Sequence, residues 1–311
     1  MTATVPPTDA GRAARRDDRR PAWEEEPGPV VQGLKGITLT GVCLAILGPL
    51  WVVLVTSLSD YRTITDAGGL VIVPKSITFA AYREILGGGA VTRAVVVSLG
   101  ITVVGTALSM AVSVLAAYGL SRPGTFAHRP ILITLLVTMF FGAGLIPTYL
   151  LVGNLGLINS YWALILPSAV SVFNIFVLRA FFMGVAPELV DSAKIDGAGE
   201  WRILLVIVLP LSRAVVAVIS LFYAVGYWSA WFNASLYIND TDKWPLQLIM
   251  RAFVIQHQPP PGMSQAIDSM QIPALSVQMA VMMLALIPVV CVYPFVQKHF
   301  TKGMLIGAVK G

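Results

Sequence analysis

The chain has 311 residues, of which 56% are hydrophobic and 12% are charged. A soluble domain carries about 25% charged residues, so this composition excludes a soluble enzyme and indicates a membrane protein. The net charge of +5 follows loops and tails rather than one stripe, which argues against nucleic acid as a partner. The two cysteines, Cys43 and Cys291, lie within apolar runs and imply no disulfide framework.

Residues 1–36 differ from the rest of the chain because prolines punctuate a run of Arg, Asp and Glu with a single aromatic residue. Such a segment cannot bury enough apolar area to order itself. It is also a poor signal peptide, since acids occur in it and the apolar run that follows has no small-residue cleavage site. We therefore expect a disordered tail at 1–36 and a membrane domain at 37–311.

Uncharged stretches long enough to cross a bilayer, which needs about 20 apolar residues per helix, predict six transmembrane helices. The uncharged stretch 130–178 is too long for one crossing and about right for two, with a glycine- and asparagine-rich turn at 153–160. The chain is thus expected to be all-α, with both ends on one side of the membrane. The stretches that carry the predicted spans are 37–59, 94–121, 130–178 (two spans), 203–232 and 273–296.

Lysine and arginine set the predicted orientation. With both termini inside, ten of these residues lie on inner segments close to the spans, against six on the outer segments. Because positive charge gathers on the cytoplasmic side, both termini and the C-terminal segment 298–311 are expected to be cytoplasmic.

Carboxylates are absent from the predicted spans: none occurs between Glu84 and Glu188, between Glu200 and Asp240, or after Asp268. Proton-coupled carriers usually need an ionisable relay at membrane depth, which this chain lacks. The three histidines lie at loops or ends, so a membrane-embedded hydrolase has no reactive set either. An ion-coupled carrier that binds its ion through the backbone carbonyls of broken helices remains an alternative. Four prolines could break helices in this way or could be tolerated as kinks: Pro147, Pro167, Pro288 and Pro294.

The loop 184–202 concentrates four acids in a pattern of helix signals. Pro187 suits a first helical turn, Glu188 suits the positive end of that helix, and Gly197 suits a left-handed stop. The sequence predicts a short helix, a glycine bend and a second short helix. Leu189 and Ala193 share a face of the first helix, and the small Ala193 would let another protein approach closely; an ordinary capped turn is the alternative.

This loop resembles the cytoplasmic signature loop of binding-protein-dependent ABC importer permeases, in which Glu-Ala-Ala is followed by Gly and then by Ile-x-Leu-Pro. Here Asp191-Ser192-Ala193 opens the pattern, Gly197 is its glycine, and Ile207 with Leu209-Pro210 closes it at the stated spacing. Asp and Ser replace Glu and Ala. The C-terminal segment 300–311 resembles that of carbohydrate-type permeases similar to the second maltose permease, and residues 144–149 and 221–228 resemble polygalacturonan- and aldouronate-type permeases.

The resemblance implies a type I ABC importer permease fold, a second permease as partner, two ATPase subunits that dock on the loop, and an external solute-binding protein. The residues it assigns to ATPase coupling are Glu188, Asp191, Ser192, Ala193, Asp196 and Gly197. No Gly-x-x-x-x-Gly-Lys-Ser/Thr loop occurs in the chain, so ATP and magnesium are expected on the partner ATPase and no cofactor on this subunit. The competing interpretations are an ion-coupled sugar carrier and an ABC permease for a solute other than a sugar.

Aromatic and amide side chains on the fifth predicted span, and one amide on the fourth, are candidates for an oligosaccharide path, since sugars offer hydroxyls and apolar ring faces. Tyr223 with Tyr227, and Tyr227 with Trp231, are four residues apart and are expected to share a helix face. Trp231 also fits an interfacial aromatic belt, and Asn174 also fits a hydrogen bond between helices. The full candidate set is Asn174, Tyr223, Tyr227, Trp228, Trp231 and Asn233.

Overall fold

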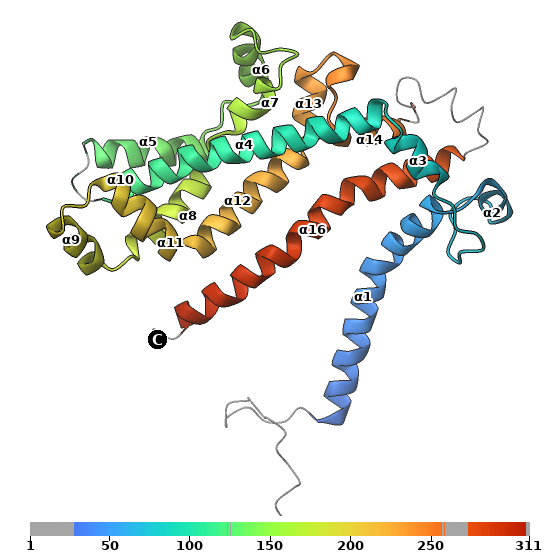
Figure 1. The fold of residues 1–311 in the computed structure, drawn as a ribbon, viewed down its shortest axis with the longest axis horizontal. Coiled ribbons are helices and arrows are strands. Elements are labelled where there is room, and N and C mark those ends of the chain that lie inside the picture. Colours follow the sequence, from blue (N-terminus) through green and yellow to red (C-terminus); the bar gives the residue numbers. More distant parts are fainter. Residues whose placement is uncertain (1–27, 123, 125, 257, 259–272, 309–311) are drawn as a thin grey trace, which may run out of the picture. The chain divides into compact units, whose positions relative to one another are not determined.

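The computed structural model describes residues 28–308 apart from 123, 125, 257 and 259–272, and every regular element in that part of the chain is a helix. The chain divides into two units, 1–50 and 51–311, which are described separately. Of the disordered tail predicted at 1–36, the part at 1–27 falls outside the described residues. Figure 1 shows the helices in chain order.

Three helices are long and apolar enough to span a membrane by themselves: α1 (Pro29–Ser57), α4 (Ala90–Ser121) and α16 (Ala274–Ala308). They contain all of the predicted span 94–121 and nearly all of the predicted spans 37–59 and 273–296. Helix α1 begins before the predicted tail boundary at 36, because Pro29 suits a first helical turn and little charge follows it. Helix α16 likewise runs through most of the predicted tail 298–311, and it contains Pro288 and Pro294 without ending at either.

The other predicted spans are bent helix pairs. In the first pair, α5 (His128–Phe140) and α6 (Leu145–Asn154) are bent by 114°. In the second, α7 (Trp162–Ile165), continued by the short helix η1 (Leu166–Ser168), and α8 (Val172–Met183) are bent by 51°. In the third, the helical segment 200–211 and α12 (Arg213–Trp228) are bent by 87°. Counting each pair as one span gives six in the described residues.

Two of these breaks were not predicted. The α5–α6 break contains Gly142 and Gly144, and Gly144 has a φ of 85° that favours glycine. The stretch 203–232, predicted to carry one span, contains a break. The second short helix predicted to run into Leu209-Pro210 is present as α10 (Glu200–Ile203), the π-helical turn η2 (Leu204–Val208) and α11 (Leu209–Leu211), and a sharp bend at Ser212 follows it. Pro210 lies at this bend, where its missing N–H removes a helical hydrogen bond. By contrast, the turn predicted at 153–160 is confirmed, since α6 ends at Asn154 and α7 begins at Trp162.

The core of the larger unit forms where α4 lies along α12 and α8 (Figure 1). Small residues follow one face of α4 at helical spacing: Gly105, Ser109, Ser113 and Ala117 are all buried. Two tyrosines of α12 pack on this face, and their hydroxyls bond Ser109 at 2.8 Å and Ser113 at 2.7 Å. The Tyr227 ring lies so close to Gly105 that an added Cβ would come within 2.8 Å of it.

A second buried cluster joins α16 to α3 (Ala80–Leu86), α12 and α14 (Leu246–Val254). Trp228 belongs to this cluster, and its indole N–H donates a 3.0 Å hydrogen bond to the carbonyl of Ala285 on α16. The remaining elements of the larger unit are α2 (Tyr61–Asp66), α9 (Pro187–Ile195), α13 (Trp231–Tyr237) and η3 (Thr241–Lys243).

Candidate coupling segment and solute site

The segment 184–202 folds as the sequence predicts. Helix α9 has Pro187 in its first turn and ends at Ile195, and Gly197 has a left-handed φ of 78°. The N–H groups of Gly197 and Ala198 donate to the carbonyls of Lys194 and Ala193, at 3.0 and 2.9 Å. This pair of bonds is the Schellman arrangement, which satisfies carbonyls left open at the helix end. Helix α10 then begins at Glu200.

Five of the six residues assigned to ATPase coupling are exposed: Glu188, Asp191, Ser192, Asp196 and Gly197. The sixth, Ala193, is partly buried and packs against the main core. Its small size therefore serves packing within the chain, which the prediction of a close approach by another protein had not considered. Val190 anchors the helix with 3% exposure, while Leu189 and Ile195 expose 48% and 87%.

Polar contacts tie this segment to the end of α4. The Tyr118 hydroxyl donates to the Glu200 carboxylate, and the Lys194 ammonium lies 3.1 Å from the same carboxylate. The Arg122 guanidinium donates to the Tyr118 hydroxyl at 3.2 Å and lies over the tyrosine ring at 4.9 Å. Sequence analysis missed this link, because Tyr118 and Glu200 are 82 residues apart and nothing in their spacing predicts the contact.

A cavity of about 700 Å³ lies between α9 and the ends of α4 and α8. Its polar lining includes Tyr118, Arg122, Asp191, Lys194 and Glu200. The coupling segment therefore contacts the main core through apolar side chains such as Val190 and Ala193, and it meets the end of α4 through polar contacts beside this cavity.

Four of the six candidate solute residues come together around one cavity of about 250 Å³ between α8, α12 and α13: Asn174, Tyr223, Tyr227 and Asn233. The side-chain amides of Asn174 and Asn233 make no hydrogen bond within the described part of the chain. The tyrosine hydroxyls differ, because each bonds both a serine of α4 and the backbone, namely the Ser171 N–H for Tyr223 and the Ile165 carbonyl for Tyr227.

The other two candidates lie elsewhere. Trp228 faces α16, where its N–H is already bonded. Trp231 does not share a helix face with Tyr227, contrary to the spacing argument, because α12 ends at Trp228 and α13 starts at Trp231. It exposes 37% of its surface, and the Arg251 guanidinium stacks over its ring at 4.0 Å.

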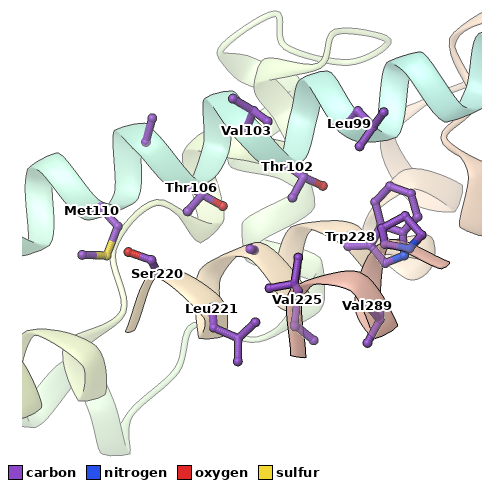
Figure 2. A pocket seen from close by; sticks show the side chains of 14 residues that line it. Leu99, Thr102, Val103, Thr106, Met110, Ser220, Leu221, Val225, Trp228 and Val289 are labelled. Atoms are coloured by element: carbon purple, nitrogen blue, oxygen red, sulfur yellow. The ribbon is translucent and has the colours of Figure 1, made fainter. Parts of the chain in front are cut away.

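A third cavity, of about 530 Å³ and mainly apolar, lies between α4, α12 and α16 (Figure 2). Thr102 and Thr106 of α4 are on its wall, as Figure 2 shows, and their buried hydroxyls have no hydrogen-bond partner among the residues that the structure describes. Ser220 of α12 instead bonds the carbonyl of Val216. Apart from these hydroxyls the lining is apolar, which suits a hydrophobic helix or lipid better than a sugar.

Comparison with known proteins places the chain in a family. No protein-family profile matches it. The chain is 46% identical over 242 residues to the polygalacturonan/rhamnogalacturonan transport system permease protein YtcP of Bacillus subtilis, covering 78% of this chain and 85% of that protein. It is 43% identical over 240 residues to the protein LplC of the same organism, covering 77% and 81%.

A solved structure agrees with these relatives. The crystal structure of a bacterial ABC transporter involved in the import of the acidic polysaccharide alginate contains a chain that superposes with a TM-score of 0.81, at 28% identity, over 89% of this chain and 99% of that one. The resemblance carried by the loop is thus confirmed, and so is the all-helical permease fold. The chain belongs to the family of membrane permease subunits of bacterial ABC importers for sugars, and such subunits are transport proteins rather than enzymes.

Proposed function

We propose that this permease forms half of the translocation path of an ATP-driven importer for acidic oligosaccharides. It would pair with a second permease, two ATPase subunits and an extracytoplasmic solute-binding protein. Support for the substrate class comes from the relatives, whose names refer to polygalacturonan, rhamnogalacturonan and alginate. The sequence supports the need for partners, since it has neither a phosphate-binding loop nor an ionisable relay within the spans.

The observation that carries the proposal is the exposed helix–bend–helix segment from α9 to α10. ATP and magnesium bind the partner ATPase, and that subunit docks on the exposed acids of α9, the bend at Gly197 and the apolar side chains of Leu189 and Ile195. Movement of the ATPase would then reach α4 through Glu200 and Tyr118.

Both termini and the segment 184–202 are cytoplasmic in this proposal, and the loop elements α13, η3 and α14 are on the outer side. The bias of lysine and arginine supports this orientation. A single reporter cysteine at Ser192, in a chain with Cys43 and Cys291 replaced, tests it. A membrane-impermeant maleimide should label this cysteine in inverted vesicles only. Labelling from outside intact cells would show that the topology is the opposite one, so the segment 184–202 could not bind a cytoplasmic ATPase.

The solute path passes the cavity lined by Asn174, Tyr223, Tyr227 and Asn233. The two open amides offer donors and acceptors to sugar hydroxyls, while the tyrosine rings offer apolar surface. Because both tyrosine hydroxyls are already bonded, they hold the wall of the cavity in place rather than bind solute.

Reconstitution tests the whole proposal. Proteoliposomes that hold both permeases and the ATPase should take up labelled oligogalacturonide only under two conditions. ATP must be on the side of the membrane where the ATPase lies, and the binding protein must be outside. The purified single subunit should bind no nucleotide and move no sugar. Uptake by this subunit alone under a proton or sodium gradient would instead establish an ion-coupled carrier.

A further inference from the structure

The outer helix α13 begins with an aromatic pair beside a cation. Trp231 and Phe232 meet edge to face, with ring centroids 5.5 Å apart and planes at 81°. The guanidinium carbon of Arg251, from α14, lies 4.0 Å from the centroid of the Trp231 ring. A guanidinium held over an indole by a cation–π contact loses side-chain freedom, while N–H groups that do not face the ring can still donate to a ligand.

Arg251 has no carboxylate partner within the described residues. Two neighbouring cations on the same side of the fold are different: Arg93 forms an ion pair with Asp242, and Lys243 lies 3.9 Å from Asp240 and donates to the Asn159 carbonyl. A partly buried guanidinium over an aromatic ring, with no carboxylate beside it in the described part of the chain, suits an anion because it has already lost part of its hydration.

The pair lies next to the proposed solute cavity. Ala230 and Asn233, on either side of Trp231 in the sequence, both line that cavity. The indole also exposes 37% of its surface, which leaves room for the apolar face of a sugar ring. The first turn of α13 therefore places Trp231, with Arg251 over its ring, beside the cavity that the amides of Asn174 and Asn233 line.

We propose that Arg251 and Trp231 form a carboxylate-recognition site for uronic acid residues at the outer end of the solute path. The guanidinium edge binds the sugar carboxylate through two parallel hydrogen bonds, and the indole contacts the ring. This inference rests on the proposed function and deepens it, since it assigns the charge preference of the importer to one residue of this subunit.

The test uses the complete importer with its binding protein in proteoliposomes, and two sugars of the same length: tetragalacturonate and its fully methyl-esterified form. Esterification removes the charge and keeps the ring. Uptake is measured as kcat/KM for each sugar, and the acid-to-ester ratio of each variant is divided by that of the wild type. This division cancels the preference of the binding protein, which is the same in every sample.

Arg251→Gln should lower the acid-to-ester ratio at least tenfold, as expected for the loss of a charge-assisted bidentate contact. The matched control is Arg93→Gln, which removes an outer arginine that is already ion-paired and should change the ratio less than twofold. An Arg251→Gln variant that slows both sugars equally, or neither, would show that Arg251 contacts protein or lipid instead and would overturn the proposal.

Two further results keep the test decisive. If Arg251→Gln fails to assemble, Arg251→Lys retains the charge without the planar fork and should lower the ratio several-fold; an unchanged ratio would refute the site. If the wild-type importer moves neither galacturonide with ATP, the proposed substrate class fails and this inference with it. Transport of both sugars by the wild type with no effect at Arg251 rejects this inference alone.

Discussion

Replacing Gly197 with alanine separates strain within the chain from contact with the ATPase. Gly197 has a φ of 78°, a conformation that costs a residue with a Cβ about 1 to 2 kcal/mol. Apart from its two chain neighbours, no described residue has an atom within 4 Å of the Cβ that alanine would add, so no clash with those residues adds to this cost. The permease should therefore insert and accumulate normally, and any larger effect must come from a partner that packs against the bend.

Gly156 provides the matched control, because it too has a left-handed φ, 68°, and open space around an added Cβ, but lies in the turn between α6 and α7. Co-purification of the ATPase with the permease pair is the assay, alongside membrane abundance. Gly197→Ala should lose at least tenfold of the retained ATPase, and Gly197→Asp more, whereas Gly156→Ala should retain it. Equal retention and equal uptake in all three variants would mean that the segment 184–202 is a plain capped turn.

Three further predictions concern the membrane core and the solute path. Gly105→Ala should lower the free energy of unfolding by about 1 to 3 kcal/mol, since the new Cβ would lie 2.8 Å from a buried tyrosine ring. The control is Gly100→Ala on the same helix, where an added Cβ has no described neighbour within 4 Å and should not change stability. Thermal unfolding in detergent compares the two variants. Tyr118→Phe removes the hydrogen bond to Glu200 and should reduce sugar moved per ATP hydrolysed while the ATPase stays bound, so an unchanged ratio would contradict a role in coupling. Asn174→Ala should raise the apparent KM for uptake several-fold at normal abundance, and an unchanged KM would place the solute elsewhere.

The features that sequence analysis predicted correctly depend on local chemistry. Apolar length predicts α1, α4 and α16, and the signals around Pro187 and Gly197 predict the helix, bend and second helix. Each of these follows from residues close together in the chain, where propensity and capping act directly.

The features that it missed depend on packing between distant segments. Composition cannot distinguish a straight span from one bent by 87° at Ser212, because both are equally apolar. Helical spacing placed Tyr227 and Trp231 on one face, but the helix ends between them. The link from Tyr118 to Glu200 and the stacking of Arg251 on Trp231 join separate elements, so no local pattern predicts either contact.

The hydroxyl pairs between α4 and α12 restrict how this permease can move. Shifting α12 along α4 by half a helical turn, about 2.7 Å, would break the bonds of both tyrosines to Ser109 and Ser113 at once. In a bilayer core no water replaces those bonds, so intermediate positions are costly. Helices α4 and α12 should therefore travel as one rigid body when the transporter changes between inward- and outward-open states. The change between these states should therefore occur mainly by bending at breaks between helices, above all at the glycine-containing break between α5 and α6.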